Sequence, residues 1–327
     1  MRKLRNLLIL ALAACLLLTA CGGGDAPAPV YTDPPEETRE AKDLGEVTIL
    51  FTGNIRNLFE KNETRGEIGY AALVAYRKTL EDDGLQVILV DGGNAMASEG
   101  AGAVRKGRTL ADLIDSVGYD VRVVGETELT YGMKDFRNLT EKMDASAYLS
   151  CNLVDEDGQT VFASYEIVEC GDVKVAFVGI TTPHAADTLG DDNYGFCQGA
   201  SKEDFFAAIQ DAIDAASNAG AEYVIAVGAL GTDPLDSPWT CAEIIANTTG
   251  LSAFLDCGGG VLEGMTVKDL DNYEIPVCAV GSEFHYVGQI ALNLNDGTAE
   301  VDLLTELEDE NTTVAKAAAD LAKELDK

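Results

Sequence analysis

Short apolar runs alternate in this chain with segments whose apolar residues recur at helical spacing, and this alternation limits the possible folds more than any other feature. Apolar runs typical of buried strands lie at 47–51, 87–90, 121–124, 173–180, 223–227 and 253–255. Helical spacing marks the segments 71–80, 109–117, 133–143, 205–219 and 240–247. Strand followed by helix, repeated along a chain, predicts an α/β domain whose ligand crevice lies at the carboxyl ends of the strands.

The remaining residues extend the same pattern. Further strands are predicted at 148–153, 161–169, 277–280 and 287–294, and a last helix at 314–325. Cys170-Gly171-Asp172 separates two of these strands and predicts a hairpin turn. Because 46% of the residues are hydrophobic, we expect the region after the first forty or so residues to build a substantial core.

Four of the predicted strands end in polar or glycine-rich loops. These loops are Gly53-Asn54-Ile55-Arg56, Asp91-Gly92-Gly93-Asn94, Gly125-Glu126-Thr127-Glu128 and Asp256-Cys257-Gly258-Gly259-Gly260. A fifth, Gly228-Ala229-Leu230-Gly231, is nearly apolar. Since the carboxyl ends of parallel strands meet at one edge of a sheet, we expect these loops to converge on a single site.

Several stretches in this order are specific enough to indicate a family. They are Val47 to Gly53, Val90-Asp91-Gly92-Gly93, Tyr131-Gly132, Ser150-Cys151-Asn152-Leu153, Val178 to Pro183, Pro238-Trp239-Thr240 and Leu255-Asp256. From Glu46 to about Leu304 the chain resembles the calcineurin-like metallophosphoesterase domain of the bacterial 5′-nucleotidase and 2′,3′-cyclic-nucleotide phosphodiesterase family. The resemblance implies a four-layer sandwich, in which two mixed β-sheets pack together and helices cover their outer faces.

The same resemblance implies two divalent metals, but every matched ligand position is substituted here. Asn54 and Arg56 stand where the family's first loop has an aspartate and a histidine, and Asn94 stands at the bridging aspartate. Glu126 and Thr127 match the third-loop asparagine and catalytic histidine. Ala229, Gly258 and Gly260 match three later histidines. An asparagine lacks the charge that balances a dication, and Arg56 adds a permanent cation. A two-metal hydrolase holds its cations through imidazoles and carboxylates. We therefore expect no standard dinuclear site, no catalytic residues at these positions and no metal cofactor.

Four carboxylates remain near the predicted crevice, and they have two interpretations. Asp91, Glu126, Glu128 and Asp256 offer oxygen ligands, which suit Ca²⁺ or Mg²⁺, so one weak hard-cation site is possible. Alternatively, Asp91 and Asp256, which are not family ligands, brace the loops by accepting backbone hydrogen bonds.

A binding site for an anion is the other hypothesis for these loops. Arg56 can pair with a phosphate or carboxylate, and the glycines at 258–260 let backbone N–H groups approach a ligand. The alternative is that the glycines only fill space, while Arg56 bridges Glu126 or Glu128. The two histidines, His184 and His285, follow none of these loops and are expected to be surface or structural residues. The candidate binding residues are Asn54, Arg56, Asp91, Asn94, Glu126, Glu128 and Asp256.

The N-terminus predicts export and lipid attachment. A basic start, an apolar run at 7–18 and Leu18-Thr19-Ala20-Cys21 form a lipoprotein signal over residues 1–20. The apolar run of about twelve residues is shorter than the roughly twenty of a transmembrane helix. We expect Cys21 to carry the lipid that attaches the chain to the bacterial cell membrane, outside the cytoplasm; an uncleaved N-terminal anchor is the alternative. Residues 21–43 lack apolar periodicity and predict a flexible linker, followed by one domain at 44–327.

The net charge excludes one class of binding partner, and the cysteine content leaves the disulfide pairing open. A formal net charge of −33 repels phosphate backbones and argues against nucleic-acid binding. Six of the eight cysteines follow Cys21, and the sequence does not determine whether or how Cys151, Cys170, Cys197, Cys241, Cys257 and Cys278 pair.

Three functions remain. The first is a non-catalytic, lipid-anchored module that binds a small anionic ligand or an envelope protein through the former active-site face. The second is an active phosphoester hydrolase of nucleotidase or phosphodiesterase type with a rearranged metal site, and the third is a structural envelope lipoprotein. Because the sequence stops after the helix at 314–325, we expect no C-terminal nucleotide-specificity domain.

Overall fold

The computed structural model describes residues 43–98, 103–141, 143, 146–190, 193–197, 202–233 and 237–325. The predicted signal, Cys21 and residues 21–42 of the predicted linker lie outside the described residues. From Asp43 onward the chain forms one compact unit. Within the described residues no helix is both long and apolar enough to cross a membrane.

The first sheet has six strands in the order β14-β13-β1-β2-β3-β4. Its parallel part comprises β1 (Glu46–Thr52), β2 (Gln86–Asp91), β3 (Val121–Val123) and β4 (Tyr148–Leu149). Two antiparallel strands, β13 (Val287–Asn293) and β14 (Ala299–Leu304), extend its other edge. The sheet is therefore mixed, as predicted.

The second sheet is also mixed and has the order β11-β12-β10-β9-β7-β6. Its central strands are parallel: β12 (Glu274–Val280), β10 (Ala253–Asp256), β9 (Tyr223–Gly228) and β7 (Val173–Ile180). The outer strands, β11 (Val261–Lys268) and β6 (Tyr165–Cys170), are antiparallel to their neighbours. A separate antiparallel ribbon pairs β5 (Leu153–Asp155) with β8 (Tyr194–Phe196).

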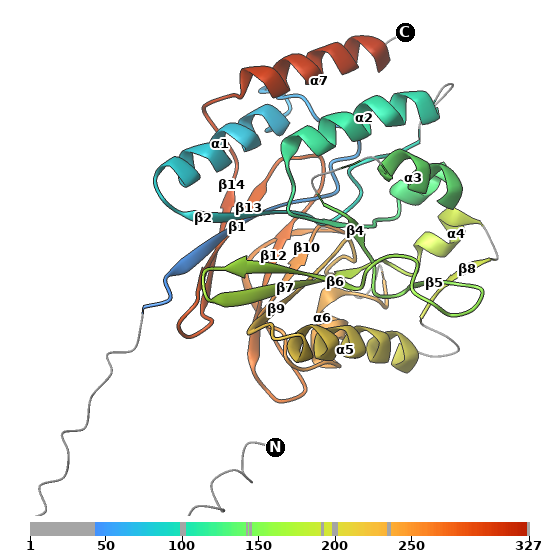
Figure 1. Cartoon of the computed structure of the whole chain (residues 1–327), viewed down its shortest axis with the longest axis vertical. Helices are drawn as coiled ribbons and strands as arrows, with labels where there is room; N and C mark the ends of the chain where they lie inside the picture. Colours follow the sequence, from blue (N-terminus) through green and yellow to red (C-terminus); the bar gives the residue numbers. More distant parts are fainter. Residues whose placement is uncertain are drawn as a thin grey trace, which may run out of the picture. The chain divides into compact units, whose positions relative to one another are not determined.

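Helices cover both outer faces and complete the predicted four-layer sandwich (Figure 1). On the first sheet lie α1 (Tyr70–Asp82), α2 (Ala103–Val117), α3 (Met133–Thr140) and α7 (Thr312–Leu325). On the second lie α5 (Lys202–Asn218) and α6 (Cys241–Ala246). Two short elements lie in connections: η1 (Glu128–Tyr131) between β3 and α3, and α4 (Ala185–Leu189) between β7 and β8.

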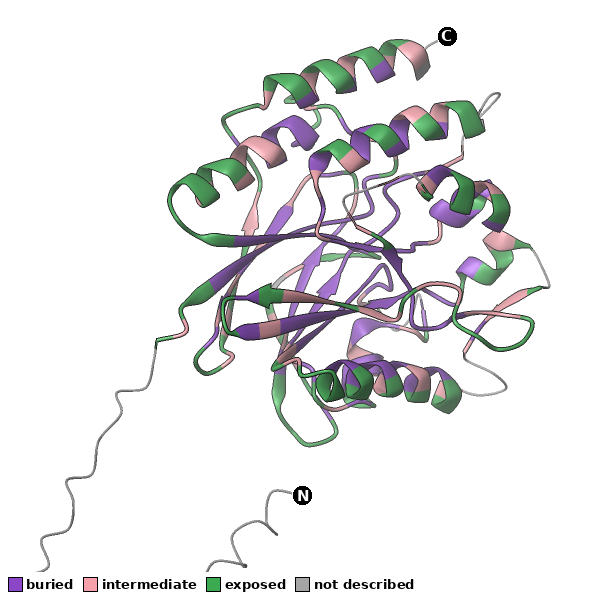
Figure 2. Cartoon of the chain, in the orientation of Figure 1, coloured by how far each residue is buried: buried purple, intermediate pink, exposed green. Residues whose placement is uncertain are grey.

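The alternation of side chains along the strands produces three cores. In β1, Ile49 and Phe51 pack between the two sheets, whereas Leu50 points to the opposite face and packs with the helices of the first sheet. A third core lies between the second sheet and α5 and α6. Buried residues accordingly follow the strands and the inward faces of the helices in Figure 2.

Two predicted strands differ from the structure for a local reason. The strand predicted at 148–153 divides into β4 and β5, because the side chains between them bond to the backbone instead of continuing a ladder. Asn152 Oδ1 accepts the N–H of Thr181 at 2.9 Å, and its Nδ2 donates to the Thr181 carbonyl at 2.7 Å. The strand predicted at 161–169 begins only at Tyr165. The alternating strands β11 and β14 were not predicted.

Candidate functional site

The strand-end loops meet at one polar pocket, as the sequence predicts. It lies at the carboxyl ends of strands from both sheets and has a volume of about 240 Å³. All five predicted loops contribute to its lining, which comprises Arg56, Asn94, Glu126, Thr182, His184, Ala229, Leu230, Gly231, Thr232, Asp233, Ser237, Gly258, Gly259 and Gly260.

Backbone hydrogen bonds join the loops after β1 and β2 directly. The N–H of Asn54 donates to the Gly93 carbonyl at 2.7 Å, and the N–H of Arg56 donates to the Asn94 carbonyl at 2.8 Å. The φ angles of Asn54, Arg56 and Asn94 are 52°, 53° and 58°, in the left-handed region that residues other than glycine seldom adopt. Such conformations persist where the surrounding contacts enforce them, and they cluster at functional sites.

Arg56 does not form the predicted bridge to Glu126 or Glu128, so that interpretation is wrong. Its Nε donates to Asn54 Oδ1 at 2.7 Å, and the side chain is exposed at the pocket. Arg56 has a left-handed backbone and lines the pocket, and its guanidinium bonds to the amide of Asn54 rather than to a carboxylate. Arg56 therefore presents a cation to whatever enters.

Glu128 is fully buried and holds the loop after β2 together. One carboxylate oxygen accepts the N–H groups of Ala95 and Met96 at 2.8 and 2.9 Å, and the other accepts those of Asn94 and Gly125 at 2.8 and 3.0 Å. Burial raises the pKa of Glu128, and these N–H donors partly offset the rise. Glu128, a predicted binding residue, therefore has both carboxylate oxygens bonded to N–H groups of the surrounding loops.

Glu126, two residues earlier, behaves differently. It is half-buried at the pocket, and its Oε1 accepts a hydrogen bond from Thr188 Oγ1 at 2.6 Å. Thr127 turns its backbone toward Asn94, whose Oδ1 accepts the Thr127 N–H at 2.9 Å. Of the third loop, therefore, Glu126 alone lines the pocket.

Asp256 and Asp91 are also fully buried and bond to loop backbone, as the bracing interpretation predicts. Asp256 accepts the N–H of Gly258 at 2.7 Å and that of Gly231 at 3.1 Å, which joins the loops after β10 and β9. Burial raises the pKa of Asp256 to about 6. Asp91 accepts only the N–H of Gly93, at 3.2 Å; burial and the neighbouring charge of Glu128 raise the pKa of Asp91 to about 8.

The predicted hard-cation site is not assembled. Within the described residues no group of three or more His, Cys, Asp or Glu side chains could hold a metal ion. Asp256 and Glu128 use their oxygens on backbone N–H groups of different loops, and neither lines the pocket. The alternative of a site formed by Asp91, Glu126, Glu128 and Asp256 is therefore not supported.

The residues present do not fit the two divalent metals that this fold implies. At Gly258 a Cβ atom would lie 2.3 Å from Leu230 N and 2.4 Å from Gly231 N, so the backbone leaves no room for any side chain there, including a histidine. Gly260 has space, because its nearest contact would be Thr232 Oγ1 at 3.5 Å. Ala229 and Thr127 offer no carboxylate or imidazole, and Arg56 places a cation at the matched first-metal position.

The sequence interpretation missed five residues of the pocket lining: Thr182, His184, Thr232, Asp233 and Ser237. His184 is the titratable residue among them that can also donate a hydrogen bond when neutral. It follows β7 and the stretch Thr181-Thr182-Pro183, and it lines the pocket beside Ser237, with Nε2 and Ser237 Oγ 3.2 Å apart. The signal was available, since β7 is a parallel strand whose carboxyl end points to the same edge as the other loops. His285 does not line the pocket, as expected.

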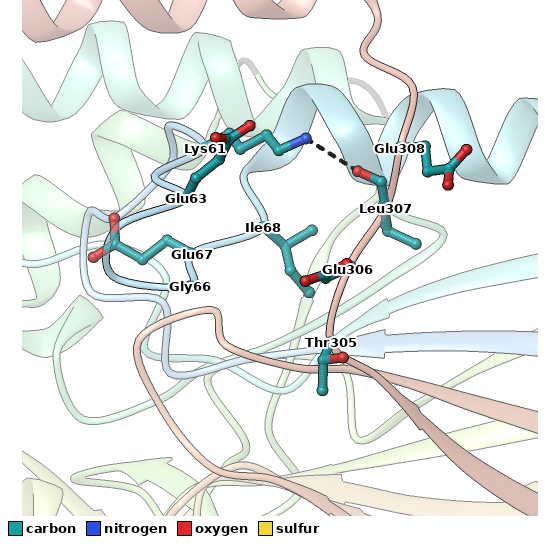
Figure 3. A pocket seen from close by; sticks show the side chains of 9 residues that line it. All are labelled: Lys61, Glu63, Gly66, Glu67, Ile68, Thr305, Glu306, Leu307 and Glu308. Atoms are coloured by element: carbon teal, nitrogen blue, oxygen red, sulfur yellow. Dashed lines mark hydrogen bonds between the residues drawn. The ribbon is translucent and has the colours of Figure 1, made fainter.

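A second cavity, of about 320 Å³, lies away from these loops. It is formed by the segment between β1 and α1 and the segment between β14 and α7, and most of its charged lining is acidic (Figure 3). Lys61 Nζ donates to the Leu307 carbonyl at 3.2 Å across it. No predicted site residue lines this cavity.

The sandwich of two mixed sheets and the pocket at the strand ends define a metallophosphoesterase fold. The structure of the calcineurin-like phosphoesterase YfkN from Bacillus subtilis matches with a TM-score of 0.68 and 17% identity, over 86% of this chain and 97% of that one. No protein-family profile matches the chain.

Proteins with similar sequences indicate which metallophosphoesterases the chain resembles. Protein UshA of Salmonella pullorum is 29% identical over 173 residues, covering 50% of this chain and 30% of that protein. The 5′-nucleotidase of Vibrio vulnificus is 29% identical over 194 residues, covering 56% of this chain and 32% of that protein. The match thus spans about a third of the length of these relatives. The chain is thus distantly similar to 5′-nucleotidases and UshA proteins over part of their length, and it has the calcineurin-like metallophosphoesterase fold.

Proposed function

We propose that this chain is a non-catalytic binding module of the 5′-nucleotidase/UshA family, which holds a small anionic ligand in the pocket at the strand ends. One observation carries this proposal: the exposed guanidinium of Arg56 lines a pocket in which the backbone leaves no room for a side chain at Gly258. The pocket thus offers a cation to a ligand at a position where the family places a metal.

The lining supplies further groups that suit a phosphate or carboxylate. His184 and Ser237 lie beside each other, and the hydroxyl of Thr232 and the glycine backbone at 258–260 line the same space. A charged hydrogen bond from a guanidinium to an anion is about twice as strong as a neutral one. The carboxylates of Glu126 and Asp233, which also line the pocket, favour a ligand that carries hydroxyl or amino donors over a bare anion.

Calorimetric titration with AMP and with inorganic phosphate tests this proposal. We expect both probes to bind, and AMP to bind with higher affinity, because its ribose hydroxyls can donate to the carboxylates of Glu126 and Asp233. Arg56→Gln should weaken binding by about tenfold, the loss of one charge-assisted hydrogen bond. The matched control is Arg65→Gln, which removes a guanidinium that pairs with Glu67 outside the pocket. Equal affinities for wild type and Arg56→Gln, or no binding of either probe, would reject the anion site.

The lipid anchor is part of the same proposal and is tested separately. The signature Leu18-Thr19-Ala20-Cys21 supports attachment through Cys21 on the outer side of the membrane. Cys21→Ser should move the protein to the soluble fraction in a fractionation of expressing cells. A variant that keeps its membrane association after its signal has been removed would show that the anchor is something else.

A further inference from the structure

Two of the six cysteines in the described residues lie together at the β5–β8 ribbon. The six thiols are free in the structure. The backbone N–H of Cys197 donates to the carbonyl of Asn152 at 2.8 Å, and Asn152 is the neighbour of Cys151. This bond continues the antiparallel ladder in which Leu153 faces Phe196. The backbones of Cys151 and Cys197 are therefore one residue apart across the ribbon.

The spacing suits a disulfide bond. Facing residues on an antiparallel ladder have Cα atoms about 4.5–5.5 Å apart, and one step along a strand adds about 3.3 Å of rise. The diagonal separation that results lies within the Cα range of about 4.4–6.8 Å that disulfides span. A bond between these residues needs no large movement of the backbone.

Neither thiol belongs to the core that Leu153 and Phe196 share. Leu153 and Phe196 both pack in the core under the helices of the first sheet. Because side chains alternate along a strand, Cys197 points away from that core. The chain bends at Cys151 and Asn152, and Cys151 packs in the separate core of the second sheet. Burial raises the pKa of the Cys151 thiol, and the nearby thiol of Cys197 raises it further.

We propose that Cys151 and Cys197 form a disulfide bond that ties the β8 segment to the chain between β4 and β5. The bond fixes the connection between β7 and α5, and this connection forms one wall of the pocket. That connection includes His184 at the pocket and Thr188, whose hydroxyl donates to Glu126. Oxidation therefore stabilises the part of the pocket that carries His184 and that bonds to Glu126 through Thr188.

The reaction needs a disulfide-bearing oxidant, either a small disulfide or an oxidoreductase. Cys197 is partly exposed, so its thiolate attacks the oxidant first, forming a mixed disulfide and releasing one reduced thiol. Cys151 then loses its proton and attacks the Cys197 sulfur, which releases the second thiol. The protein loses two hydrogens, and the oxidant is reduced to two thiols. Burial of Cys151 makes the second step the slower one.

Peptide mapping of the domain at 43–327, unfolded and then refolded in a buffer of oxidised and reduced glutathione, tests the proposal. We expect one linked peptide pair containing Cys151 and Cys197, with a protein mass lower by two hydrogens. Cys151→Ser and Cys197→Ser should each abolish the linkage, whereas the control Cys170→Ser should retain it. Six free thiols after refolding, or a bond between other cysteines, would overturn the proposal. Because this test requires neither export nor a pocket ligand, its result is independent of the proposed function.

A stability readout distinguishes a native bond from one forced by the buffer. A bond compatible with the fold restricts the unfolded chain, so the oxidised wild type should melt several degrees above its reduced form. Cys197→Ser should melt at one temperature in both buffers. An oxidised wild type that melts below the reduced form would show that the bond strains the native fold, contrary to the proposal.

Discussion

The two sheets build their halves of the pocket in different ways. Loops from the first sheet are bonded to one another and present polar side chains to the pocket, with Asn94, Arg56 and Glu126 in its lining. Loops from the second sheet approach each other so closely that Gly258 has no room for a side chain. In the first half the matched positions Arg56, Asn94 and Glu126 line the pocket, whereas at position 258 in the second half backbone atoms fill the space that a side chain would need.

Both halves nevertheless depend on a buried carboxylate. Glu128 accepts four backbone N–H groups in the first half, and Asp256 joins two loops in the second. These carboxylates hold the loops in place without any metal ligand, which explains how the site can keep its shape when the matched ligand positions are substituted. The comparison predicts that stability depends on the buried carboxylates, and that ligand binding depends on the pocket side chains.

Glu128→Gln should have the largest effect on stability. An amide keeps the shape of the carboxylate but turns an NH₂ donor toward two of the four backbone donors, leaving them without an acceptor. Unsatisfied buried donors cost about 1–3 kcal/mol each, so the free energy of unfolding should fall by roughly 3 kcal/mol. Chemical denaturation measures this fall. The matched control, Glu126→Gln, should change stability little, and equal effects of the two variants would contradict the division of roles.

Gly258→Ala should have the next largest effect. The added methyl group would lie within 2.5 Å of three backbone atoms of the loop after β9, so one of the two loops must move. Overpacking of this kind costs about 1–3 kcal/mol. Gly260→Ala is the control, because its nearest contact at 3.5 Å is ordinary. If both variants unfold at the same denaturant concentration, the loops are not closed as described.

Asp91→Asn should have an effect on stability that depends on pH. The carboxyl of Asp91 has a pKa of about 8 in the folded chain, against about 3.9 in an unfolded one. Between these values the folded state keeps a proton that the unfolded state releases, so the contribution of Asp91 to stability is lost as pH rises through this window. The variant should therefore gain stability relative to wild type between pH 5 and pH 8, measured by thermal melting. A difference that is constant with pH would show that Asp91 is ionised throughout.

Much of the fold was predictable because its strands are fully buried and therefore read as apolar runs. The predicted strand at 173–180 matches β7, and the convergence of the loops follows from the parallel strand order. The half-exposed strand β14 was missed because its apolar residues alternate with acidic ones, as in Ala299 to Leu304.

The details of the site were less predictable, because they depend on backbone geometry that residue types do not specify. The sequence left open whether Arg56 meets an anionic ligand or bridges Glu126 or Glu128, and in the structure its guanidinium bonds to Asn54. The closeness of Gly258 to the loop after β9 is likewise a property of two distant segments. The parallel strand β7 pointed to a place near the pocket for the residues that follow it, but the hydrogen bond that sets His184 beside Ser237 joins two distant segments.

Metal-dependent turnover tests the central claim most directly. Purified protein should be assayed on AMP and on cyclic phosphodiesters with added Mn²⁺ or Zn²⁺, with and without a chelator, and its bound metal should be measured in parallel. The account predicts sub-stoichiometric metal and no metal-dependent hydrolysis, because the residues at the matched ligand positions cannot hold two cations. Hydrolysis that the chelator abolishes, with stoichiometric bound metal, would contradict it and establish an active phosphoesterase with a rearranged metal site.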